Sequence, residues 1–216
     1  MYAHHVRMAL VVVFLILTTG LCVADELQPI KLNSPDTTRG LPFMKTLAVK
    51  ASVREWSAKD LSLQDLSDLM WAANGLNRPG ENKTTASSAM NAHDVDIFAF
   101  MKNGVYRYDF KLHELQPVLA GDYRGEIVDR PAPTDPPVLI VLISDPDRFP
   151  VGTDETRYEW GALDAGIISQ NISLFCASTG LKTVPRAMMK KDRIRELLKL
   201  KENQHIFLNH PVGYKE

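Results

Sequence analysis

The sequence has little cysteine and no excess of charge of either sign. Two cysteines, Cys22 and Cys176, occur among 216 residues, which excludes a small fold held together by several disulfides. The 25 basic and 26 acidic side chains nearly cancel, so a nucleic-acid-binding surface is not expected. No metal site is expected either, because the histidines after the N-terminal region are scattered and lack ligand spacing: His93, His113, His205 and His210.

The longest apolar run is close to the N-terminus. A weakly basic start precedes the apolar residues 8–17, and Cys22-Val23-Ala24 supplies the small residues that signal peptidases read. We therefore expect residues 1–24 to be a signal peptide cleaved after Ala24, which makes the mature protein periplasmic or secreted. The run is short for a membrane span, so no stable membrane insertion is expected after cleavage. A retained anchor is the alternative.

The mature chain suits one domain. Residues 25–45 are polar and contain three prolines, so we expect an exposed N-terminal arm there. The ordered domain is then expected over residues 46–216, a length that allows a sizeable core. Without the leader, 24 basic and 26 acidic side chains remain, and Cys176 has no partner for a disulfide.

The stretch 159–181 is expected to be the central element. Its only charged residues are Glu159 and Asp164. Large apolar residues recur at helical spacing on one side: Trp160, Leu163, Ile167, Ile168, Leu174 and Phe175. Small residues fill the other side, among them Gly161, Ala165, Ser169, Ser173 and Cys176. This pattern predicts a long helix that is buried on all sides and capped by Gly180.

The other elements follow from periodicity and turn signals. We expect helices from Ser62 to Asn74 and around 194–198, strands at 95–101, 105–108, 138–143 and 206–212, and loops at 76–86 and 121–137. The aliphatic run 138–143 indicates a central strand, and Pro211 is expected to interrupt the last one. Interleaved helices and strands of this kind predict an α+β fold with a mostly antiparallel sheet.

Three polar stretches are candidates for ligand binding. Lys50, Ser52 and Arg54 leave one face of an extended segment, which suits an anion and a polar ring edge. Residues 84–91 are small and polar directly before a strand, and 211–215 end in a glycine turn and a cation. Each stretch alone is equally typical of a solvated loop or strand end.

Together and in this order, these stretches resemble the nitroreductase-like family of FMN-dependent oxidoreductases, and most closely the branch that includes azoline-oxidising dehydrogenases. The resemblance extends from about Leu47 to Lys215. It is carried by Lys50-Ala51-Ser52-Val53-Arg54, Trp71 to Asn77, Ser87-Ser88-Ala89-Met90-Asn91, Gly104 to Asp109, Asp164-Ala165-Gly166 with Gln170-Asn171, and Val212-Gly213-Tyr214.

The resemblance implies a three-layer fold and a homodimer that binds FMN between its subunits. The flavin would pass a hydride between a donor, with NAD(P)H as a candidate, and a small organic acceptor. By position, Lys50 and Ser52 would hold the phosphate with Lys215 nearby, and Arg54 would face the pyrimidine edge. Ser88 and Asn91 belong to the loop at that same edge, and the backbone N–H of Ala187, with that of Arg186, would lie near flavin N5. No catalytic side chain is identified.

Four positions depart from the family pattern: Lys50 and Ala51 replace basic residues, Ser87 replaces a proline, and Ala187 replaces a common glycine. Lysine lacks the bidentate fork of arginine, so we expect weakened cofactor binding. The alternative is a non-catalytic dimeric protein that binds flavin or another ligand, and a hydrolase using an unrecognised serine is a third reading. Export also separates the protein from most NAD(P)H. The enzyme could therefore use another electron donor, or it could oxidise its substrate with oxygen or a quinone as the electron acceptor.

Overall fold

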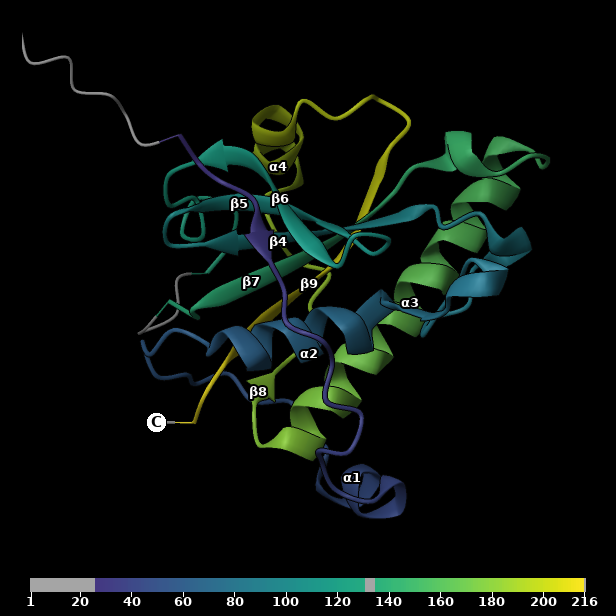
Figure 1. Ribbon diagram of the computed structural model, residues 1–216. Helices are drawn as coiled ribbons and strands as arrows, with labels where there is room; N and C mark the ends of the chain where they lie inside the picture. The colour runs from purple at the N-terminus through teal and green to yellow at the C-terminus, as the bar shows by residue number, and fades with distance from the viewer. Residues whose placement is uncertain (1–25, 131–134, 216) are drawn as a thin grey trace, which may run out of the picture.

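A seven-stranded antiparallel sheet divides the protein into three layers (Figure 1). The computed structural model describes residues 26–130 and 135–215, so the predicted signal peptide lies outside the described part. The strand order is β1-β6-β5-β4-β7-β9-β8, with β1 (Ile30–Lys31), β4 (Val95–Met101), β5 (Gly104–Asp109), β6 (Glu114–Ala120), β7 (Val138–Ser144), β8 (Lys182–Thr183) and β9 (His205–Gly213). The α+β class and the mostly antiparallel sheet are confirmed.

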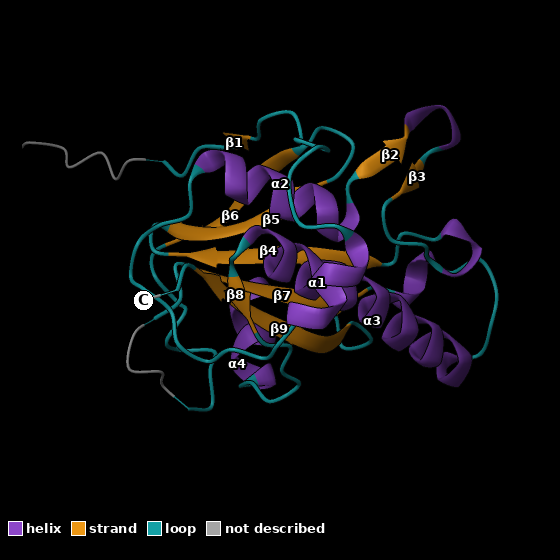
Figure 2. Cartoon of the chain, turned by 90° about the horizontal axis from the view of Figure 1, so that it is seen from below, coloured by secondary structure: helices purple, strands orange, loops and turns teal. Residues whose placement is uncertain are grey.

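Helices cover both faces of this sheet (Figure 2). One core lies under α2 (Leu63–Asn74) and α3 (Asp154–Thr179), and the other lies under α4 (Lys191–Leu198) and the loop that carries Ile127 and Val128. Every residue of β7 is buried, as its aliphatic run predicted, because it is covered on both faces. The short ribbon of β2 (Leu76–Arg78) and β3 (Lys83–Thr84) stands apart from the main sheet, in a stretch that was predicted to be a loop.

The predicted long helix is present, but its burial differs from the prediction. Thr153 caps its start, and Gly180 ends it with a φ of +84°. The small-residue side packs on the sheet: a Cβ at Gly161 would lie 2.4 Å from the hydroxyl of Ser144. The large apolar side is partly open to solvent in the single chain, with Leu163 66% and Ile167 38% exposed. Burial on all sides is therefore wrong for the monomer.

Residues 26–45 are exposed along most of their length, yet they are tied to the domain. β1 pairs with β6, and Leu32 is buried in the core. Arg39 forms ion pairs with Asp65 at 2.6 Å and Asp68 at 2.7 Å on α2. These contacts add an edge strand that local polarity did not predict.

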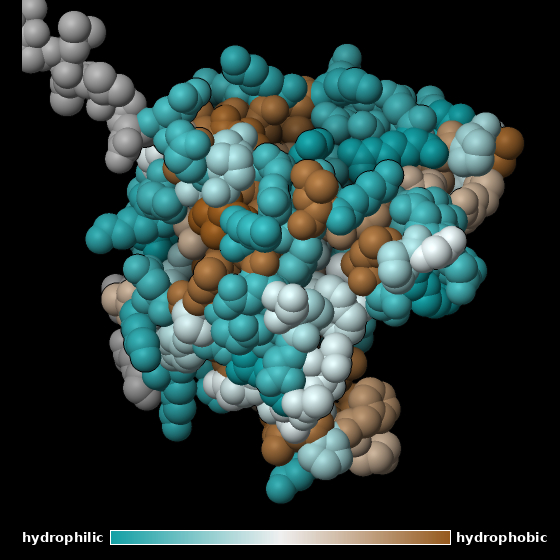
Figure 3. Space-filling view, in the orientation of Figure 1, coloured by the Kyte–Doolittle hydropathy of each residue, from teal (hydrophilic) through white to brown (hydrophobic). Residues whose placement is uncertain are grey.

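The helix α1 (Phe43–Val49) follows and packs against α3. It leaves four large apolar side chains exposed, namely Phe43, Met44, Leu47 and Val49. Apolar surface is visible at the lower edge of the molecule in Figure 3, where Figure 1 shows α1. Exposed apolar side chains grouped in this way are typical of surfaces that bind another protein.

One further expectation needs correction. β9 runs uninterrupted through Pro211. The N–H of Asn209 points outward to Arg186, and the missing N–H of Pro211 lies on that same side, away from β7. The described parts of the loop after Gly121 pack on the domain, since Ile127 belongs to the core and Arg124 donates to the carbonyl of Pro136 at 2.8 Å. Within the described residues, no helix is long and apolar enough to cross a membrane.

Candidate functional site

Three of the predicted site cations come together where α1 ends. Lys50 is the C-cap of α1 with an extended backbone, and the N–H of Val53 donates to the carbonyl of Thr183 at 3.0 Å. This bond brings the segment 50–54 against β8 and the loop that carries Arg186. The pKa of Arg186 is lowered by burial and then by the charge of Arg54, so the two guanidinium groups are neighbours. Ser52 and Arg54 are exposed, and Lys50 is half-buried.

No ion pair with a described acidic side chain neutralises these cations. Among residues 26–130 and 135–215, no acidic side chain forms an ion pair with Lys50, Arg54 or Arg186. Unpaired like charges held side by side repel one another, and the repulsion is relieved when an anion binds between them. We call Lys50, Ser52, Arg54 and Arg186 the cation cluster.

Lys215 follows the end of β9 and lies near the segment that comes after Arg54. Gly213 pairs with Lys182, and the N–H of Ser57 donates to the carbonyl of Tyr214 at 3.1 Å. The indole of Trp56 in turn donates to the carbonyl of Lys182 at 3.2 Å. The C-terminal segment and the segment that follows Arg54 are therefore adjacent, and Lys215 itself is exposed.

The loop at Arg186 and Ala187 is held by a buried asparagine that the sequence reading did not identify. Arg186 and Asn209 exchange two backbone hydrogen bonds, at 2.9 and 2.8 Å. The Asn209 side chain accepts from Arg186 Nε and donates to the carbonyls of Arg186 and Met188. The N–H of Arg186 is thereby occupied, and that of Ala187 has no acceptor among the described residues. Ala187 is not among the residues with positive φ, so alanine fits there without strain.

A buried histidine lies beneath the cation cluster. The His210 ring is 2.8 Å from the Ser169 hydroxyl and 3.3 Å from that of Thr183. Burial, and then the charges of Arg186 and Lys50, lowers the pKa of His210 to about 3. The ring is therefore neutral at physiological pH and adds no further charge to the cluster.

Ser88 and Asn91 lie elsewhere, in a strained turn before β4. Met90, Asn91 and His93 have φ values of +52°, +55° and +48°, which is uncommon for residues other than glycine. The hydroxyl of Ser88 accepts from the N–H of His93 at 3.0 Å, and Asn91 donates to the carbonyl of Asn82 at 3.3 Å. The N–H of Ala89 donates to the buried carboxylate of Asp164 at 2.8 Å. We call residues 88–91 the left-handed turn.

The cation cluster and the left-handed turn do not meet within one chain. No hydrogen bond between described residues joins them, and they contact different parts of α3: Asp164 holds the turn, whereas Ser169 contacts His210 beneath the cluster. The structure therefore brings Lys50, Ser52, Arg54, Arg186, Ala187 and Lys215 into one region and leaves Ser88 and Asn91 in another.

Sequence reasoning did not single out Thr183, Asn209, His210 or Asp94 as functional. All four are buried polar residues. The one available signal was Asn209-His210, two polar residues within a predicted apolar strand. Buried polar groups must be hydrogen-bonded, so such a pair indicates a specific partner but does not identify it.

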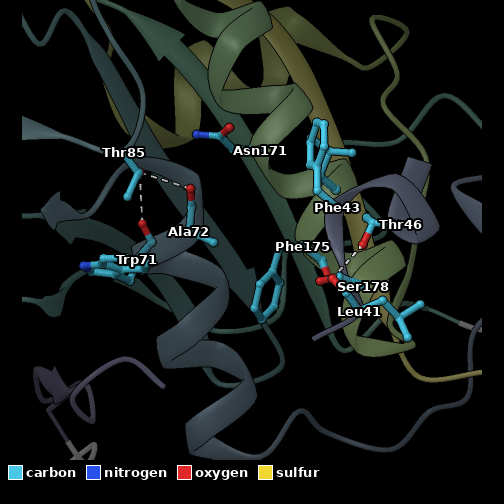
Figure 4. Close-up of a pocket in the computed structure, with 10 residues that line it drawn as sticks. Leu41, Phe43, Thr46, Trp71, Ala72, Thr85, Asn171, Phe175 and Ser178 are labelled. Carbon is cyan, nitrogen blue, oxygen red and sulfur yellow. Dashed lines mark hydrogen bonds between the residues drawn. The ribbon is translucent and has the colours of Figure 1, made fainter. Parts of the chain in front are cut away.

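A separate open cavity of about 360 Å³ lies between α1, α2 and α3 (Figure 4). Its walls combine aromatic and small polar side chains, among them Phe43, Trp71, Thr85, Asn171, Phe175 and Ser178. On one side of the cavity, Thr85 donates to the carbonyls of Trp71 and Ala72, each at 3.1 Å. None of the predicted cofactor residues lines it.

Known proteins match this chain over most of its length. A protein of Methanocaldococcus jannaschii named as a nitroreductase is 26% identical over 179 residues, covering 78% of this chain and 89% of the relative. A nitroreductase-type structure from Ralstonia eutropha JMP134 has a TM-score of 0.82 at 31% identity, covering 90% of this chain and 92% of the other. The E. coli microcin synthetase McbBCD complex shares the fold, with a TM-score of 0.65 at 17% identity over 79% of this chain and 73% of its own. The family model of the Nitroreductase family matches residues 47–214, and the chain therefore belongs to the nitroreductase family.

Proposed function

We propose that this nitroreductase-family oxidoreductase uses FMN to transfer a hydride between an electron donor and a small organic acceptor. The observation that carries the proposal is the cation cluster, whose Arg186 is on the same loop as the N–H of Ala187, which has no acceptor in the described part of the chain. A flavin nucleotide requires both features, a cationic grip for its phosphate and a hydrogen-bond donor near its reactive nitrogen. When bound, FMN would supply the hydride chemistry at N5.

Each residue of the proposed site would have its own role in binding the flavin. Lys50 and Ser52 would hold the phosphate, with Lys215 close to it. Arg54 would face the pyrimidine edge, where a cation stabilises negative charge that develops during reduction. The N–H of Ala187 would donate toward N5, in an orientation maintained by the bonds between Asn209 and the loop.

The left-handed turn would complete the site from a second copy of the chain. Ser88 and Asn91 lie away from the cation cluster, so one chain supplies only part of the proposed pocket. The Asn91 amide can both donate and accept a hydrogen bond, as the polar edge of a flavin requires. The exposed apolar side chains of α1 and α3 support a homodimer as the active form.

Export of the mature chain belongs to the same proposal. A periplasmic or secreted enzyme meets little NAD(P)H. Either another electron donor reduces the flavin, or the enzyme oxidises its substrate and passes the electrons to oxygen or a quinone. Anaerobic mixing of FMN-loaded protein with NADPH, followed by addition of oxygen or a quinone, measures the two half-reactions separately.

Absorbance of the purified protein tests the proposal directly. A yellow protein that takes up FMN to one equivalent per chain and is bleached reversibly by dithionite or NADPH supports an enzyme. A protein that binds FMN but exchanges electrons with no donor or acceptor fits the alternative, a non-catalytic flavin-binding dimer, which the unusual Lys50 and Ala51 favour. Absence of any FMN binding would overturn the enzyme and favour a non-catalytic dimer that binds another ligand.

A further inference from the structure

The left-handed turn rests on two buried carboxyl groups whose role the proposed function does not explain. Asp94, directly before β4, and Asp164, on α3, are 0% and 4% exposed. The Ser144 hydroxyl of β7 donates to Asp94 Oδ2 at 2.5 Å. The close approach of α3 depends on Gly161, because a Cβ there would lie 2.4 Å from Ser144 Oγ and 3.3 Å from Asp94 Oδ2.

One oxygen of this group has no partner when both carboxyls are ionised. Asp94 Oδ1 is buried without a hydrogen-bond partner among the described residues. Asp164 is one helical turn from Gly161, which approaches Asp94, and its charge acts on Asp94. Two neighbouring buried carboxylates repel each other strongly. A proton on Asp94 removes the repulsion and lets Asp94 donate to Asp164. Burial, opposed by the Ser144 bond and reinforced by Asp164, raises the pKa of Asp94 to about 7.

The charge that remains on Asp164 is directed at the left-handed turn. Asp164 Oδ2 accepts from the N–H of Ala89 at 2.8 Å. The next two residues, Met90 and Asn91, both have positive φ, a conformation that persists only where the surroundings enforce it. A hydrogen bond to a carboxylate is stronger than one to a neutral acceptor, so Asp164 is well suited to hold this turn.

We propose that Asp94 and Asp164 share one proton, and that this carboxyl–carboxylate pair positions the left-handed turn so that Asn91 meets the cofactor. The inference rests on the proposed function for the identity of that cofactor. Asp94 and Asp164 are positioning residues, since they act on the cofactor through the backbone of Ala89.

Two other ionisable groups near the pair are already engaged. Arg148 donates to Asp96 and to the carbonyl of His93. Asp145 accepts from the N–H of Asp147. The His93 ring contacts the carbonyl of Asn82 through Nε2, and its Nδ1 is buried without a partner among the described residues. No described cation forms an ion pair with Asp94 or Asp164. The shared proton is therefore the element that holds the two carboxyls together.

The sign of the pH effect follows from this arrangement. Below the raised pKa, Asp94 is protonated and the pair is intact. As pH rises through about 7, Asp94 loses its proton, the carboxylates repel and the Ala89 bond weakens. FMN affinity should therefore fall about tenfold between pH 6 and pH 8.5, a change comparable to the loss of one hydrogen bond to a charged group.

The test is a flavin-fluorescence titration of the full dimeric protein over that pH range for four proteins. The parent should lose affinity as pH rises. Asp94→Asn should be flat, because its amide donates to Asp164 at every pH, and Asp164→Asn should bind more weakly even at pH 6. Glu159→Gln, which removes an exposed carboxylate from the same helix, should follow the parent. Parallel pH profiles for the parent and Asp94→Asn would overturn the inference.

A measurement without cofactor separates this inference from the proposed function. In the apoprotein, the Ala89 amide proton resonance should shift with the titration of Asp94 in the parent and stay constant in Asp94→Asn. If that shift is seen but no FMN binds at any pH, the proposed function fails and the shared proton stands. If the Ala89 resonance does not respond between pH 6 and 8.5 in the parent, the shared proton is wrong even where FMN binds.

Discussion

Asn209 and Arg186 are joined by four hydrogen bonds, two between their backbones and two that use the Asn209 side chain. A fifth bond links the Asn209 amide to the carbonyl of Met188. Asn209 is 1% exposed, so water cannot replace these bonds. A buried residue on the penultimate strand of the sheet thus determines the conformation of the loop that presents the Ala187 amide.

Asn209→Ala should destabilise the protein and loosen this loop. It removes the side-chain bonds to the carbonyls of Arg186 and Met188 and to Arg186 Nε, while the two backbone bonds remain, at a cost of about 1–3 kcal/mol in the free energy of unfolding. Urea unfolding measures the change. Asn209→Asp should also destabilise, because it keeps the acceptor and loses the donor. Asn203→Ala, which removes an exposed asparagine bonded to Asp147, is the control and should leave the midpoint unchanged. Equal midpoints for Asn209→Ala and Asn203→Ala would contradict the role assigned to this residue.

Lys50→Arg should tighten FMN binding. An arginine offers two parallel hydrogen bonds to a phosphate where lysine offers a point charge, a difference of about 1 kcal/mol. Lys50→Ala should weaken binding by roughly 1.5–3 kcal/mol. Fluorescence titration of apoprotein at two salt concentrations measures both, with Lys111→Ala, an exposed lysine on the β5–β6 turn, as the control. Identical affinities for all variants would remove Lys50 from the phosphate site.

Arg54→Ala should slow turnover more than it lowers flavin occupancy. The Arg54 charge matters most when the reduced ring becomes anionic, so the barrier should rise by about 2–4 kcal/mol. Stopped-flow reduction and reoxidation at full flavin occupancy measures this, and Arg54→Lys should recover part of the rate because it retains the charge. Unchanged rates in Arg54→Ala would mean that this side chain does not face the ring.

Leu163→Glu should convert a homodimer into monomers. Leu163 is 66% exposed on α3, and a carboxylate buried there against a second copy would lose its hydration. Sedimentation velocity at micromolar concentration measures the change. The control is Leu112→Glu, which alters a residue of similar exposure, 60%, in the turn between β5 and β6. A parent protein that is monomeric at this concentration would rule out a site shared between subunits.

Local sequence patterns were sufficient for the elements that depend on nearest neighbours along the chain. Short-range signals of this kind are the N-cap at Ser62, the C-cap at Gly180 and the aliphatic run of β7. The N-cap at Thr153 is another such signal, but it was not used in the prediction. The order of the motifs along the chain was likewise sufficient to identify the family, which the match over residues 47–214 supports.

Only the tertiary structure decided which groups meet. Periodicity places large and small residues on opposite sides of α3, but the small side is buried because Gly161 lets the helix approach Ser144. The charge of Lys50 acts on His210, and that of Asp164 acts on Asp94, although the two residues of each pair are far apart in sequence. Such pairings depend on how the sheet brings distant segments together, and local propensity carries no information about them. The family motifs could therefore be found in the sequence, whereas the buried residues that hold them in place could not.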